Sequence, residues 1–297
     1  MRPTFIVNNR NKQGFVGTAV AGALSQTVPC EILISDFKST DKSTDEIKRA
    51  IDESPRGASH DVRFVTCPLH PAQTMQSVNE HFDWMVSQTK GEWIFQSSSD
   101  DYSLPDRVRV CMEAVENHPC SVVATTMWFE KPGEAKRQAR SGFPTETGYV
   151  KPGEGLLRLA YGSVIAAYHR DFLTRVGNGG PNTLDVYYGF MAALDKGFYV
   201  VCDQQHVHVE HESVNNIGFQ GKMRGAGGDD LLRLAELNHF QLLQLYDGVA
   251  ECCKRLHPDG INPDDWDALL NMIFGQAKGW LEARKVLHAK GVTPGVL

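Results

Sequence analysis

Short apolar runs and amphipathic segments alternate along the first 130 residues of the chain. The apolar runs, rich in Val, Ile and Phe, lie at residues 4–7, 31–35, 62–66, 92–96 and 121–129. Segments with apolar side chains at helical spacing lie between them, at residues 15–25, 43–51, 72–88 and 108–117. Strands that alternate with helices favour a parallel sheet with crossover helices on its faces. We therefore predict an α/β fold.

The pattern changes between residues 130 and 155, where Gly, Pro and charged residues dominate. A loop of this length inside a compact domain is usually functional or disordered, and we expect a flexible loop here. Lys136, Arg137 and Arg140 give it a positive bias that suits phosphate or an anionic acceptor, although a solvated loop would contain the same residues. Strand and helix patterns resume from residue 163 and continue to residue 202.

A Gly-rich linker at residues 225–228 precedes two long segments with helical apolar spacing, residues 229–255 and 263–290. We predict a first domain of residues 1–224 and a helical extension of residues 225–297. The extension packs on the sheet, forms a homodimer interface or provides a surface for an acceptor molecule, and the sequence does not distinguish these roles.

Composition narrows the class of protein. The 297 residues are 41% hydrophobic and 22% charged, which is ordinary for a protein with a sizeable core. A net charge of -6 gives no general attraction to nucleic acid or anionic membranes. Seven cysteines without metal-finger spacing favour reduced thiols. The N-terminal apolar run is too short for a signal peptide, and no stretch reaches 18 uninterrupted apolar residues. We expect a cytoplasmic protein without a membrane span.

A polar cluster follows the apolar run at residues 92–96. Three serines lead into Asp100 and Asp101, and Pro105 then opens the next helix. Open α/β sheets bind ligands at the carboxyl ends of their strands, where a carboxylate suits a divalent cation that carries phosphate oxygens. Taken alone, the cluster is more simply interpreted as a turn that caps a helix.

Three other nucleotide-binding classes lack their motifs. No G-x-G-x-x-G follows the first predicted strand and no Walker lysine motif occurs, so dinucleotide-binding and P-loop interpretations lose their main support. A nucleotidyltransferase would require a Gly-rich, Arg-containing loop after the first strand, and that loop is absent.

Three segments together resemble the family 2-like glycosyltransferases of GT-A fold. They are P-T-F-I-V-N-N-R-N near the N-terminus, E-I-L-I-S-D-F-K-S-T-D from residue 31, and G-E-W-I-F-Q-S-S-S-D-D-Y from residue 91. They occur in the family's order and spacing. The resemblance implies a GT-A-type, Rossmann-like mixed sheet that is mainly parallel and flanked by helices. It also implies transfer of a sugar from a nucleoside diphosphate donor, UDP by similarity, to an acceptor hydroxyl with inversion and with Mn²⁺ or Mg²⁺.

By position, the resemblance implies that Asn9 and Asn11 wall the nucleotide pocket and that Asp36 contacts the base. Asp100 matches the second Asp of the metal-binding D-x-D motif, and Asp101 is the adjacent supporting acid. The first Asp of that motif is Ser98 here. Because a serine carries no charge and is a poorer ligand, metal dependence is an open question.

The second half of the chain supplies the remaining implied residues. Asp185 matches the general base that deprotonates the acceptor, although an Asp near a helix N-terminus is also favoured by the helix dipole. His211 and His208 resemble the histidine that completes the metal site in several family members, and an imidazole ligand would compensate for Ser98. Solvent-facing histidines on an edge strand are the alternative interpretation.

Two functions follow from the resemblance. The first is a glycosyltransferase whose acceptor is a soluble saccharide, a protein side chain or, less favoured by the net charge, a hydroxylated nucleic-acid base. The second is a non-catalytic sugar-nucleotide or glycan-binding protein of the same fold, which the missing Asp at position 98 supports. Release of a nucleoside diphosphate from a sugar donor would separate the two.

Overall fold

The computed structural model describes residues 2–70, 75–131, 133–138, 146–150, 165–177, 187–188, 191–192, 195 and 197–209. Its strands are β1 (Pro3–Asn9), β2 (Glu31–Asp36), β3 (Asp61–Thr66), β4 (Trp93–Ser98), β5 (Tyr102–Ser103), β6 (Val122–Glu130), β7 (Arg137–Gln138), β8 (Gly148–Val150), β9 (Ala166–His169) and β10 (Phe198–Val209). Its helices are α1 (Val16–Leu24), α2 (Ser43–Asp52), α3 (Met75–Ser87), α4 (Arg107–Asn117) and α5 (Arg170–Val176), with a short 3-10 turn at Gly57–Ser59.

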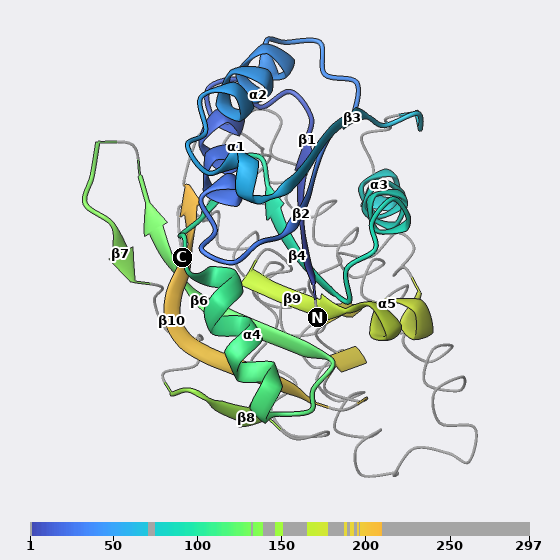
Figure 1. The fold of residues 1–297 in the computed structure, drawn as a ribbon, viewed down its shortest axis with the longest axis vertical. Coiled ribbons are helices and arrows are strands. Elements are labelled where there is room, and N and C mark those ends of the chain that lie inside the picture. The colour runs from blue at the N-terminus through green and yellow to red at the C-terminus, as the bar shows by residue number, and fades with distance from the viewer. Residues whose placement is uncertain are drawn as a thin grey trace, which may run out of the picture. The chain divides into compact units, whose positions relative to one another are not determined.

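The strands form one mixed sheet in the order β3–β2–β1–β4–β9–β6–β10–β5 (Figure 1). The four strands β3, β2, β1 and β4 are parallel, and β10 is parallel to β6. Between these two parallel groups lies β9, which is antiparallel to both of its neighbours. The predicted α/β class, with a mainly parallel sheet flanked by helices, is confirmed.

The central strands are apolar on both sides because helices cover both faces of the sheet. Alternate side chains of β1 and β2, such as Phe5 and Ile32, pack in one cluster with residues of α1, α2 and α4. The intervening residues Ile6 and Leu33 are also fully buried. They point to the opposite face, where α3 contacts β2 through His81 and Ser35.

The second half of the sheet differs from the sequence prediction in two places. β10 continues to Val209, beyond residue 202, where the predicted strand and helix patterns end, and its pairing with β6 shifts register around Gln204. Such irregularities break the alternation that marks a strand in sequence. In addition, β7 and β8 lie within the segment predicted as a loop, and they pair with β6 and β10. The predicted domain boundary at residue 224 lies outside the described residues.

No helix in the described part of the chain combines the length and the apolar character that a membrane crossing requires.

One charged side chain is buried among β4, β5 and β9. Arg107, the first residue of α4, is fully buried and donates to the Gln96 carbonyl and the Ser103 hydroxyl at 2.9 Å each. It also donates to the Ala166 carbonyl at 3.2 Å, so one guanidinium joins β4, β5 and β9. Its carbon lies 5.7 Å from the centre of the Phe5 ring. Burial lowers the pKa of Arg107 to about 10, which leaves it charged at neutral pH.

Replacing Arg107 with Met should reduce the free energy of unfolding by about 3 kcal/mol, because buried acceptors lose their donor. Urea unfolding measures the change. Arg109→Met is the matched control on the same helix, where the exposed guanidinium pairs with Asp106 and Glu113. Surface pairs of this kind contribute little, so the control should unfold at nearly the wild-type urea concentration. Equal midpoints for the two variants would contradict the role given to Arg107.

Candidate functional site

The ends of β1, β2 and β4 bring the predicted site residues to one edge of the sheet. In the parallel register, Asn9 is opposite Asp36 on β2 and Asn8 is opposite Ser98 on β4. The loops that follow these strands therefore leave the sheet side by side. This is the edge at which open α/β sheets bind ligands.

Asn9 and Asp36 are in direct contact. The Asn9 amide donates to Asp36 Oδ1 at 2.8 Å, and both side chains are buried. The same carboxylate accepts the Ser39 hydroxyl at 2.6 Å and the Ser39 backbone N–H at 2.9 Å. Asp36 thus closes the turn that follows β2, in which Lys38 has a left-handed backbone with φ of 54°. The carboxylate is held by three donors, one from Asn9 at the end of β1 and two from Ser39 in the turn after β2.

Asn11 joins the same two loops rather than standing apart from them. Its backbone N–H donates to the Ser39 hydroxyl at 2.8 Å, and its side-chain oxygen accepts the Thr40 backbone N–H at 2.7 Å. The residues that follow continue the pattern, because Lys12 N–H donates to Ser43 Oγ at 3.0 Å. The loop after β1 is consequently anchored along its backbone to the segment before α2.

His81 of α3 contacts the end of β2, just before this turn. Its Nε2 lies 2.7 Å from the hydroxyl of Ser35, the residue before Asp36, and its ring stacks on Phe37 with centres 4.4 Å apart. Burial lowers the pKa of His81 to about 4, although the nearby Asp36 charge acts in the opposite direction. His81 is therefore neutral in the folded protein at pH 7. The sequence analysis did not identify it, since its spacing is that of an ordinary inward-facing helix residue.

Asp100 is paired with a lysine from the other loop. The Lys12 ammonium lies 2.5 Å from Asp100 Oδ2, and the two side chains are only 14% and 16% exposed. The pair bridges 88 residues of sequence and connects the loops after β1 and β4. Neither composition nor spacing in the sequence indicated this contact.

Asp101 is directed away from this pair, toward β10. It accepts the Val209 backbone N–H at 3.0 Å, and His208 Nδ1 lies 3.0 Å from its Oδ1. The Ser98 hydroxyl donates to Asp101 at 3.2 Å, and His206 Nε2 lies 3.5 Å away. Burial alone would raise the pKa of Asp101, but the two histidines outweigh it and hold the pKa below its usual range.

The two histidines of β10 differ in their environments. His206 is completely buried beside Arg107, and burial lowers its pKa despite the Asp101 carboxylate. The side chain of His208 is 40% exposed and its ring meets Phe129 edge-on at 5.4 Å between centres. The structure thus brings the predicted ligand His208 to Asp101. His211 and Asp185, the other predicted second-half residues, lie outside the described residues.

The described side chains do not form a ready metal site. Within the described ranges, no group of three or more His, Cys, Asp and Glu side chains is arranged to hold a metal ion. Asp100 faces an ammonium, Asp101 is hydrogen-bonded to β10, and Ser98 donates its hydroxyl to Asp101. The metal ligands inferred from the sequence stay a prediction.

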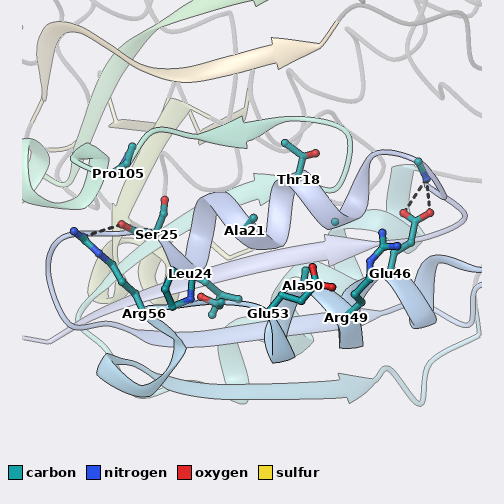
Figure 2. Close-up of a pocket in the computed structure, with 14 residues that line it drawn as sticks. Thr18, Ala21, Leu24, Ser25, Glu46, Arg49, Ala50, Glu53, Arg56 and Pro105 are labelled. Atoms are coloured by element: carbon teal, nitrogen blue, oxygen red, sulfur yellow. Dashed lines mark hydrogen bonds between the residues drawn. The ribbon is translucent and has the colours of Figure 1, made fainter.

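A separate groove of about 720 Å³ lies between α1 and α2 (Figure 2). Thr18 and Ala21 line it from α1, Glu46 and Arg49 line it from α2, and Glu53 lines it from the position just after α2. Its side chains carry both signs of charge and favour no particular class of ligand. No residue predicted to bind the donor lines it. We therefore place the candidate site at the sheet edge and not in this groove.

Two buried oxygens at the sheet edge have no donor in the described structure. They are the side-chain carbonyl oxygens of Asn8 and Asn9. Buried polar atoms in native proteins are nearly always hydrogen-bonded, so an unpaired one calls for a partner such as a ligand or water. Because these two acceptors lie at the carboxyl end of β1, they suit a ligand that carries N–H or O–H groups.

The burial of His81 predicts a specific dependence of stability on pH. Below pH 6.5 the unfolded chain binds a proton at this histidine that the folded chain excludes, so stability should fall as the pH falls from 6.5 to about 4. The contribution is about 3 kcal/mol. Urea unfolding of wild type and His81→Phe at pH 7 and pH 4 measures it: the variant should lose less stability over this interval. Identical losses would show that His81 does not titrate as inferred.

Comparison with known proteins places the chain in a family. Residues 4–199 match the model of glycosyl transferase family 2. Among solved structures, S. aureus TarS in complex with UDP-GlcNAc gives a TM-score of 0.60 at 15% identity, over 98% of this chain and 93% of that one. The mannosyltransferase PcManGT from Pyrobaculum calidifontis, in complex with GDP-Man and Mn²⁺, gives 0.51 at 14% identity, over 97% and 87%.

The search of curated proteins gave no match. At identities this low the similar structures show the GT-A-type fold alone, whereas the family model covers well over half of the chain. This protein belongs to glycosyl transferase family 2 and is a glycosyltransferase that uses a nucleotide-sugar donor.

Proposed function

We propose that this enzyme transfers a sugar from a UDP-sugar to an acceptor hydroxyl, with inversion at the sugar carbon. The observation that carries the proposal is the meeting of the Asn9–Asp36 pair and Asp100 at one edge of the sheet. These residues give the edge a base-binding end and a diphosphate end. Family membership favours an enzyme over the non-catalytic binding protein.

Asn9 and Asp36 form the proposed base-binding end. Uracil has an N–H between two carbonyl oxygens, so a carboxylate fixed in place matches its donor. Asp36 Oδ2 accepts one hydrogen bond, from the Ser39 N–H, and a carboxylate oxygen has room for a second. The unpaired Asn8 and Asn9 oxygens would accept further donors of the base or ribose. The UDP-GlcNAc complex of the structurally similar TarS supports this choice of base.

The diphosphate is proposed to lie at the Asp100 end of the site. In a similar structure, PcManGT, the donor GDP-Man is accompanied by Mn²⁺. In this chain the described donor atoms fit such an ion poorly, because Asp100 is paired with Lys12 and Ser98 carries no charge. We therefore assign no step to a metal. Asp100 and Lys12 organise the loops that face the diphosphate, and Asp101 holds β10 against them.

The reaction needs a base for the acceptor, and Asp185 is the proposed one. As the acceptor oxygen attacks the sugar carbon, the bond from that carbon to the diphosphate breaks, and the acceptor proton passes to the Asp185 carboxylate. Asp185 lies outside the described residues, so its role rests on the family resemblance. The acceptor belongs to one of three classes: a saccharide, a protein side chain or a modified nucleic-acid base. The net charge of -6 disfavours the last.

Nucleotide binding tests the donor half of the proposal. UDP should raise the unfolding temperature more than GDP, CDP or ADP at equal concentration. At about 100 times its dissociation constant a ligand adds roughly 2.7 kcal/mol of stability, which should raise the unfolding temperature by several degrees. Thermal unfolding with each nucleotide, in EDTA and in Mn²⁺, gives the comparison. A larger shift with another nucleotide would reassign the base, and no shift with any would contradict the proposed site.

Replacing Asp100 with Asn tests the diphosphate end. UDP release from UDP-sugars should slow by about 100-fold, a typical cost of removing one preorganised charged or polar group from an active site. Asp45→Asn, in the exposed first turn of α2, removes the same charge at a distance from the site and should retain the wild-type rate. Wild-type turnover in a folded Asp100→Asn protein would remove Asp100 from the site.

A further inference from the structure

Lys12 places a positive charge at the proposed diphosphate end, and the family resemblance assigns it no function. Its ammonium contacts Asp100 Oδ2, and both side chains are mostly shielded from water. Exposed ion pairs are loosely held and contribute little, whereas a shielded pair is kept in one geometry by its surroundings. The position of this ammonium is therefore a feature of the site.

The backbone around Lys12 is built to hold that position. Lys12 N–H donates to Ser43 Oγ at 3.0 Å, and the next residue, Gln13, donates its N–H to Asp41 Oδ2 at 3.0 Å. Asp41 in turn accepts the Ser43 backbone N–H at 3.0 Å. Preceding Lys12, Asn11 has a left-handed backbone with φ of 50°. Lysine side chains are flexible, so this anchoring reduces the entropy cost of placing the charge.

The charges around Asp100 differ from those of a D-x-D site. Two aspartates and a divalent ion would bring two negative and two positive charges. Here Ser98 is neutral, Asp101 is hydrogen-bonded to β10, and Lys12 already offsets the charge of Asp100. A cation bound to Asp100 Oδ2 would have to displace the ammonium or lie beside it and be repelled.

We propose that Lys12 binds the diphosphate of the sugar donor and supplies positive charge that other family members obtain from a metal ion; the inference rests on the proposed function. An ammonium has three N–H donors. One faces Asp100, which leaves two for phosphate oxygens. As the bond from the sugar to the diphosphate breaks, negative charge grows on the leaving group next to this ammonium, which stabilises it. Asp100 is then the residue that positions Lys12.

Calorimetric titration of the full chain with UDP, in EDTA and in Mn²⁺, tests this assignment without requiring an acceptor. Wild type should bind UDP in EDTA with an affinity within about 3-fold of that in Mn²⁺. Lys12→Ala should bind UDP about 10- to 100-fold more weakly in EDTA, the range for one charge-assisted hydrogen bond. Mn²⁺ should restore much of that loss, because the ion takes the vacated place. Lys12→Arg should resemble wild type in EDTA.

The controls separate diphosphate binding from a structural role. Lys48→Ala removes an equal charge from the exposed face of α2 and should bind UDP as wild type does. Lys12→Ala should weaken the binding of UMP, which lacks the second phosphate, less than it weakens the binding of UDP. If Lys12→Ala does not fold, Lys12→Gln keeps the length of the side chain without its charge and is compared in the same way.

The outcomes also distinguish this inference from the proposed function. If wild type binds UDP only with Mn²⁺ and Lys12→Ala binds equally well, Lys12 is not the diphosphate ligand, while the donor site stands. A loss of affinity that is equal for UDP and UMP and is not restored by Mn²⁺ would make the ion pair a structural link and would also overturn the inference. If wild type binds no nucleotide under either condition, the proposed donor itself is wrong.

Discussion

The carboxyl edge of this sheet brings several carboxylates together, and each of them has to be compensated. Asp36 ends β2, and Asp100 and Asp101 follow β4; these strands are the two neighbours of β1, so the three carboxylates emerge at the same edge of the sheet. Each carboxylate is paired with groups from another segment. Asp36 accepts hydrogen bonds from Asn9 and Ser39, Asp100 pairs with the Lys12 ammonium, and Asp101 accepts a hydrogen bond from β10. Uncompensated buried carboxylates would be costly, so the loops adopt the positions that bring these donors in.

Compensation of this kind also makes the site rigid. The loop after β1 is held by the turn after β2, and that turn is held in part by His81 from the helix below. A donor that enters the edge finds carboxylates and amides already oriented, so little ordering is needed when it binds. The same arrangement leaves the Asn8 and Asn9 oxygens without donors. Acceptors without donors at this edge are available to a ligand that carries N–H or O–H groups.

Beneath the edge, the sheet contains charge where most cores are apolar. Arg107 is wholly buried beside the Phe5 and Phe95 rings, and burial together with the neighbouring guanidinium lowers the pKa of His206. Arg107 Nε and His206 Nε2 both lack a well-formed hydrogen bond in the described structure. The cost of this arrangement is offset by the contacts that the guanidinium makes to three strands. These contacts connect the core to Asp101 and hence to the site.

The sequence alone determined the class of fold, since the alternation of apolar runs and amphipathic segments requires no knowledge of distant contacts. The family resemblance also selected Asn9, Asp36 and Asp100 as candidate site residues, and parallel strands bring such residues to one edge of the sheet. The sequence did not reveal the full length of β10, because the register shift around Gln204 removes the alternation of apolar and polar residues.

Only the tertiary structure decided which charge meets which. The Lys12–Asp100 pair spans 88 residues, and Asp101 meets His208 across 107. Arg107 carries the spacing of an ordinary residue near a helix start, yet the approach of β9 and β5 buries it completely. Pairings of this kind depend on how strands from distant parts of the chain lie side by side. Local periodicity contains no record of that arrangement, and only the folded sheet brings these side chains together.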